Sequence, residues 1–151
     1  MRYTKEQKEE VRNRILQAAS RSFKKGGYSG IGVDGLAKEA GVTSGAFYVH
    51  FKSKAEAFKA SVVEGLEEVQ HTLISLKKEH GTKWWTEFAS IYMGQKRTCD
   101  LNKSCAMQSL TPEVGRFDNE AKMLYENELQ KIIELVGEGC KKEDKAKAPD
   151  V

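Results

Sequence analysis

The stretch that decides the fold is VDGLAKEAGVTSGAFYVHFKSKAEAF, Val33 to Phe58. It predicts two very short helices, over 33–40 and about 44–51, which are separated by a tight turn at Gly41. Short helices are marginally stable on their own, whereas longer ones bury more surface. A function that requires one helix to project from a compact support would explain why the chain uses them.

The neighbouring sequence completes a helix-turn-helix pattern. A capping box at Thr4-Lys5-Glu6-Gln7 opens a predicted helix over about 5–25, which Gly26-Gly27 ends. The major groove of B-DNA is about 12 Å wide and accepts one helix, so the third helix is the candidate reading element. Leu36, Val42, Phe47 and Phe51 can fill a small core, which leaves near the outer face Thr43, Ser44, Gly45, Tyr48 and Val49.

The rest of the chain also reads as helix, so the predicted fold class is all-α. A second capping box at Ser53-Lys54-Ala55-Glu56 opens a long helix with one continuous apolar stripe. Further helices are expected over about 54–79, 83–96 and 118–138, with an irregular or briefly helical 97–117 in which Pro112 suits a first turn. The expected organisation is a helix-turn-helix domain over 1–52, a helical regulatory and dimerisation region over 53–140, and a polar disordered tail over 141–151.

Charge is unevenly distributed along the chain. Residues 1–60 hold 12 Lys and Arg against six Asp and Glu, whereas residues 61–151 hold 13 against 16. A basic first part is typical of a segment that meets a polyanion. No apolar run is long enough for a membrane span, the N-terminus has no secretory signal, and the three cysteines are sparse, so a reducing cytoplasm is expected.

The stretch ILQAASRSFKKGGYSGIGVDGLAKEAGVTSGAFYVHFKSKAEAF, Ile15 to Phe58, resembles the tetracycline-repressor-type (TetR) family of bacterial transcription regulators. The resemblance rests on the AGV turn, the aromatic-Tyr-x-His-Phe run and the x-SK-x-E that follows. It covers about a third of the chain, and the remainder is similar only in its helical layout. The chain departs from the family at Gly30-Ile31-Gly32, where relatives often carry a Thr or Ser that caps the second helix and contacts phosphate.

The resemblance implies that the third helix enters the major groove of double-stranded operator DNA. Phosphate contacts set the register of such a complex, and contacts to base edges select the sequence. The family positions near bases match Thr43, Ser44, Gly45 and Val49, and the positions that hold phosphate match Tyr48, His50 and Lys54. The expected function is a sequence-specific regulator, most simply a repressor released by a small-molecule effector.

The second part is expected to hold the effector and to form a homodimer. An apolar pocket is expected from six side chains, without any cofactor: Trp84, Trp85, Phe88, Tyr92, Met93 and Met107. Family members are commonly one or two helices longer, so the last helices are expected to be missing and the dimer to be weakened. The alternative is a regulator remnant that binds DNA weakly without regulated dimerisation.

Other chemistries have little support in the sequence. Cys99 and Cys105 do not have a zinc-ligand spacing, so inert thiols are expected, although nearby cations leave a redox switch open. No nucleophile–base pair, phosphate-binding glycine loop or metal cluster is recognisable, so neither an enzyme nor a metal site is expected.

Overall fold

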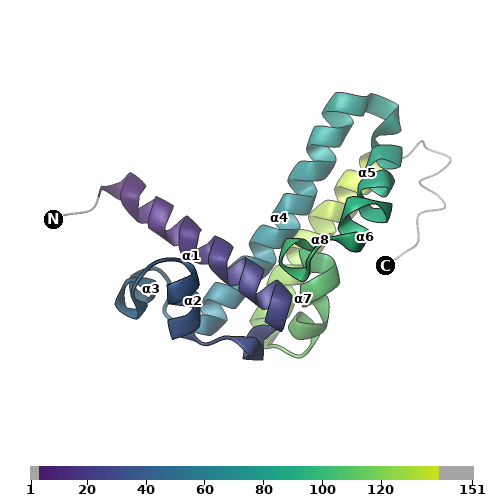
Figure 1. The fold of residues 1–151 in the computed structure, drawn as a ribbon. Coiled ribbons are helices and arrows are strands. Elements are labelled where there is room, and N and C mark those ends of the chain that lie inside the picture. Colours follow the sequence, from purple (N-terminus) through teal and green to yellow (C-terminus); the bar gives the residue numbers. More distant parts are fainter. Residues whose placement is uncertain (1–3, 140–151) are drawn as a thin grey trace.

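A computed structural model describes residues 4–139, and within that range every regular element is a helix, as the sequence predicts (Figure 1). The tail predicted over 141–151 lies outside the described residues. None of the described helices is long and apolar enough to cross a membrane. The elements are α1 (Lys5–Gly26), η1 (Tyr28–Gly30), α2 (Val33–Glu39), α3 (Ser44–His50), α4 (Lys54–His80), η2 (Gly81–Lys83), α5 (Trp84–Met93), α6 (Gln95–Thr98), η3 (Leu101–Lys103), α7 (Ala106–Gly115) and α8 (Asn119–Gly139).

The helix ends follow local signals closely. The capping box at α1 forms in full, with Gln7 N donating to Thr4 Oγ1 at 3.2 Å and Thr4 N donating to Gln7 Oε1 at 2.9 Å. At α4 only half of the predicted box forms. Ser53 Oγ accepts from Glu56 N at 3.1 Å, but the Glu56 carboxylate accepts from the backbone of Lys52 at 2.9 Å rather than from Ser53. The N-terminus of α4 is therefore capped, with the second bond one residue earlier than expected.

Helices α1 to α3, here called the head, close around a small aromatic and aliphatic core. Ile15, Leu36, Phe47 and Phe51 have no exposed surface. The turn between α2 and α3 passes through Gly41 at φ +67°, a conformation that favours glycine. In the head, α3 therefore packs against both α1 and α2 (Figure 1).

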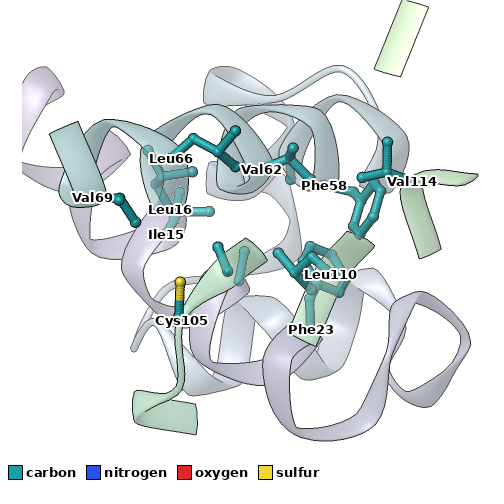
Figure 2. Close-up of a cluster of buried hydrophobic side chains, with 14 of the residues drawn as sticks. Ile15, Leu16, Phe23, Phe58, Val62, Leu66, Val69, Cys105, Leu110 and Val114 are labelled. Carbon is teal, nitrogen blue, oxygen red and sulfur yellow. The ribbon is translucent and has the colours of Figure 1, made fainter. Parts of the chain in front are cut away.

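Helices α4 to α8, here called the body, are built around the length of α4. Helix α8 runs alongside α4, and α7 packs between α4 and the C-terminal part of α1 (Figure 1). Side chains from α1, α4 and α7, such as Phe23, Phe58 and Leu110, meet in one buried cluster (Figure 2). At the crossing of α4 and α7, a Cβ on Gly65 would lie 2.2 Å from Ala106 Cβ, so only glycine permits this approach.

An aromatic cluster joins the head to the body. Tyr28, in the connection between α1 and α2, packs edge-on against Phe58 of α4 at 5.3 Å between centroids. It meets Phe117, in the connection between α7 and α8, at 4.9 Å. Next to this cluster, the Lys59 ammonium forms ion pairs with Asp118 and Glu120 at the start of α8.

The segment 97–117 is more ordered than the sequence suggests. Pro112 lies inside α7 rather than in its first turn, which corrects the prediction. Buried Ala106, Leu110 and Val114 follow at intervals of four on one face of α7, and the packing of that face outweighs the backbone hydrogen bond that proline cannot make. The helix predicted over 83–96 divides at Gly94 into α5 and α6.

Candidate nucleic-acid interface

Helix α3 presents an outward face that is free of the head's core. Phe47 points inward and is fully buried, whereas the next two side chains, Tyr48 and Val49, are 54% and 73% exposed. Gly45 also lies on the surface, and a Cβ built there would meet only Thr43 Oγ1, at 3.8 Å. This face therefore leaves the backbone open to close approach beside two exposed side chains.

The first residues of α3 are held by hydrogen bonds within the head. Thr43 is the N-cap, and its Oγ1 accepts from Ala46 N at 3.1 Å. Ser44 Oγ donates to Asp34 Oδ1 of α2 at 2.5 Å. The Thr43 O–H stays free to donate to a phosphate or a base, whereas Ser44 Oγ has donated its proton and can only accept, as from a base amine. Their contact with DNA stays a prediction. In the structure Thr43 caps α3, and Ser44 ties α3 to α2.

Cations from α1 lie beside α3, and sequence reasoning did not identify them. A groove of about 360 Å³ runs between the two helices, and Lys8, Arg14 and His50 line it together with Val49. The guanidinium of Arg12 lies 4.6 Å from the centroid of the Phe51 ring. Lys8 and Arg12 are four residues apart on one helix, which is the signal that was available.

His50 has an electropositive environment. Burial lowers its pKa below the usual value of 6.5, and the charges of Arg12 and Lys8 lower that pKa further. The imidazole is therefore mostly neutral at pH 7 in the free protein. A phosphate placed in the groove would reverse this effect, because a negative charge favours the protonated ring.

Lys54 is partly buried and turned toward the head. Its Nζ donates to the carbonyls of Tyr28 at 3.0 Å and Ile31 at 3.2 Å, and it lies 4.0 Å from the centroid of the Tyr28 ring. Two of the three ammonium N–H groups are used within the chain, so the predicted phosphate contact has one donor left. Gly32, the N-cap of α2, has no side-chain cap, in keeping with the departure at Gly30-Ile31-Gly32.

A cavity of about 620 Å³ opens in the body, between α4 and α8 on one side and α5 to α7 on the other. Four of the six predicted pocket residues line it: Phe88, Tyr92, Met93 and Met107. The prediction is wrong for both tryptophans. Trp84 is buried in the core, with Lys77 Nζ 5.3 Å from its ring centroid, and Trp85 is 62% exposed outside the cavity. Both lie in the first turn of α5, one turn before the lining residue Phe88.

Cys105, which lines this cavity, and Cys99 lie in different environments. Cys105 is buried and its Sγ accepts from the Tyr92 hydroxyl at 3.1 Å, while the half-buried Cys99 donates to the carbonyl of Lys96 at 3.3 Å. Burial, and then the bond to Cys105, raise the pKa of Tyr92. Over the range 4–139, no group of three or more His, Cys, Asp or Glu side chains is placed to hold a metal ion.

Comparison with known proteins shows which proteins share the helix-turn-helix. Residues 15–60 match the model of bacterial regulatory proteins, tetR family. The chain is 41% identical over 73 residues to the HTH-type transcriptional regulator TtgR of Pseudomonas putida, a match that covers 48% of this chain and 34% of TtgR. The chain is 46% identical over 57 residues to the HTH-type transcriptional regulator AcrR of Shigella flexneri. This match covers 38% of the present chain and 26% of AcrR. The matched part thus spans about a third or less of these relatives.

Solved structures share the fold over most of the described chain. A TetR-family regulator from Agrobacterium tumefaciens superposes with a TM-score of 0.74 at 15% identity, covering 87% of this chain and 70% of that one. The reduced form of NemR from E. coli superposes with a TM-score of 0.75 at 19% identity. This match covers 86% of the present chain and 69% of NemR. Residues 15–60 of this chain thus carry a helix-turn-helix of the type found in the tetR family of bacterial regulatory proteins.

Proposed function

We propose that this chain is a sequence-specific DNA-binding transcription regulator, rather than an enzyme, and that it acts as a repressor released by a small-molecule effector. The observation that carries the proposal is the outward face of α3, with Tyr48 and Val49 exposed beside the cations of α1. The match of residues 15–60 to the tetR family and the regulators that share this part support it. Its place of action is the bacterial cytoplasm, where the chromosome lies.

In the proposed complex α3 lies in the major groove and α1 follows the phosphate backbone. The phosphates are contacted by Tyr48, His50 and the remaining donor of Lys54. The base edges in the DNA major groove are contacted by Thr43, Ser44, Gly45 and Val49. The groove between α1 and α3, with its basic lining, suits a sugar–phosphate strand. Each phosphate neutralised adds roughly 0.9 to the slope of log affinity against log salt.

The test begins with a selection of duplexes from a random library, followed by fluorescence anisotropy on the selected and scrambled sequences. We expect affinity to fall steeply with salt and to favour the selected duplex. Tyr48→Ala should weaken every duplex about equally, and Val49→Ser should change the sequence preference. Ile74→Ser, at a half-exposed apolar position in α4, is the matched control. Equal affinity for both duplexes, or no dependence on salt, would contradict the proposal.

For regulation we propose a two-fold homodimer and an effector in the body cavity. Two heads must fit half-sites about 34 Å apart, so a small movement of α4 changes the fit. Helix α8 exposes Met123 and Ile133, which are 63% and 38% exposed, and these side chains can form the dimer contact. Light scattering should show a dimer that Met123→Glu dissociates and Ile74→Glu does not. A monomer that binds DNA weakly would favour a regulator without regulated dimerisation.

A further inference from the structure

The body cavity has the size of a small-molecule site and mostly apolar walls. Its volume of about 620 Å³ falls within the range of roughly 300–1,000 Å³ that ligand pockets occupy. The walls come from helices that meet only in the folded body, with α4 and α8 on one side and α5 and α7 on the other. The apolar lining consists of Val69, Leu73, Phe88, Tyr92, Met93, Cys105, Met107, Ile132 and Val136.

The charged side chains that line the cavity are positive. Among the residues that the structure describes, its charged side chains are two cations of α6, Lys96 and Arg97, and no carboxylate lines it. Lys96 Nζ donates to the carbonyl of Lys103 at 2.8 Å, and Arg97 Nε donates to that of Met93 at 3.0 Å. These bonds fix where the side chains lie. Over residues 4–138 neither cation takes part in an ion pair.

We infer that this cavity binds an amphipathic organic anion, with an aromatic or aliphatic body against the apolar walls and one carboxylate or sulfonate group at Lys96 and Arg97. An anion there gains charge-assisted hydrogen bonds from donors that are already in place. An organic cation of the same shape meets two like charges and no acid. The inference names the chemical class of the effector, and it rests on the proposed function only in its last step, the release of DNA.

The other polar groups of the wall do not alter this charge balance. The Tyr92 hydroxyl donates to Cys105 Sγ, so its proton is engaged within the protein. Burial raises the pKa of Tyr92, which keeps the phenol neutral at physiological pH. Gln108 carries no charge and accepts or donates equally well. The cavity therefore presents a net positive field to a guest at neutral pH.

The test compares two fluorescent probes with the same rings, anilinonaphthalene sulfonate and uncharged phenylnaphthylamine. On the full chain at pH 7 we expect the sulfonate to bind more tightly. The double variant Lys96→Gln/Arg97→Gln should weaken the sulfonate about tenfold and change the uncharged probe by less than about twofold. The control, Lys78→Gln/Lys122→Gln, removes two exposed charges elsewhere in the body and should change neither.

A competition experiment on the unmodified chain gives a second measurement that needs no variant. Decanoate should displace the sulfonate probe, and decyltrimethylammonium, with the same tail and the opposite charge, should not. Equal displacement by both, or equal weakening of both probes in the Lys96/Arg97 variant, would overturn the inference. So would probe binding that weakens as protein concentration rises, because the cavity would then be a contact between copies of the chain.

A separate arm links the site to DNA. Decanoate added to the complex with the selected duplex should release it, at concentrations that follow displacement of the probe. Failure of the chain to bind any duplex would defeat the proposed function and leave the probe results standing. Failure of the charge preference would defeat this inference while the DNA results stood.

Discussion

The head and the body both expose apolar side chains, but they do so on different kinds of support. In the head, Tyr48 and Val49 stand on a helix whose opposite side is sealed by fully buried Phe47. In the body, Met93 is 72% exposed at the rim of a cavity of about 620 Å³. A closed platform with a projecting face suits a rigid partner, whereas an open apolar cavity suits a guest that enters and leaves. The difference is the physical basis for assigning polymer binding to one region and ligand binding to the other.

The largest difference in stability is expected between substitutions at two adjacent residues of α3, one buried and one exposed. Phe47→Ala should lower the free energy of unfolding by about 3–5 kcal/mol, because it leaves a cavity in the core of the head. Tyr48→Ala, one residue along, should cost less than about 1 kcal/mol, because its side chain is mostly exposed. Chemical denaturation followed by circular dichroism measures both. Equal losses at the two positions would show that α3 is not divided into a buried and a free face.

The crossing of α4 and α7 tests how tightly the body is packed away from its cavity. Gly65→Ala would bring a Cβ to 2.2 Å from Ala106 Cβ, so the helices must move apart. We expect a loss of about 1–3 kcal/mol from overpacking. Gly137→Ala in α8, where a Cβ meets nothing within 4 Å, should instead gain up to about 1 kcal/mol from helix propensity. If Gly65→Ala left the free energy of unfolding unchanged, the packing of α4 against α7 would be loose enough to accept an extra methyl group.

The affinity of the head for DNA should depend on pH through His50. Burial, then Arg12 and Lys8, lower the pKa of His50 in the free head. Because DNA phosphate favours the charged ring, binding should take up a proton, and affinity should rise by up to about tenfold as pH falls from about 7.5 to 5.5. Anisotropy titrations at constant ionic strength measure this slope. His50→Gln should abolish it and His71→Gln, on exposed α4 surface, should keep it; a slope that survives His50→Gln would remove this histidine from the interface.

The smallest effect on stability is expected at Glu64, where α1 of the head meets α4. Glu64 Oε1 accepts from Gln17 Nε2 at 2.6 Å, but its Oε2 is buried without a hydrogen-bond partner. Burial, and then the charge of Glu68, raise the pKa of Glu64, so ionising this carboxyl destabilises the fold at neutral pH. The penalty disappears as pH falls below the carboxyl's usual value of 4.5.

Glu64→Gln should therefore raise Tm by about 2 °C at pH 7 and give no gain near pH 4. Thermal melts at the two pH values measure the difference, with Glu126→Gln at an exposed position of α8 as the control. A gain of the same size at both pH values would point to packing rather than charge.

Local signals in the sequence predict much of the fold. Thr4 and Gln7 cap α1, Gly41 makes the turn before α3, and the apolar stripe of α4 predicts its long course. Each of these depends on residues within a few positions of one another. Pro112 was misplaced because its helix is held by contacts with α1 and α4, which are distant in the chain.

The candidate interface follows the same rule. The face of α3 was predictable, since the helix carries its own periodicity from Thr43 to His50. The cations of α1 were missed because they reach α3 only through the angle at which the two helices cross. The partners of Lys54 were missed because they are carbonyls, which the identity of a side chain does not reveal.

The bonds from Lys54 to the carbonyls of Tyr28 and Ile31 tie the first turn of α4 to the segment that leads into α2. From Leu73 at the cavity to Lys54 is 19 residues of one helix, a rod about 28 Å long. A tilt of about 5° at the cavity end of this rod displaces the other end by roughly 2.5 Å. Such a displacement is several times the range of roughly 0.5 Å over which a hydrogen-bond distance stays good, so a modest adjustment around a guest suffices to misalign the head on DNA.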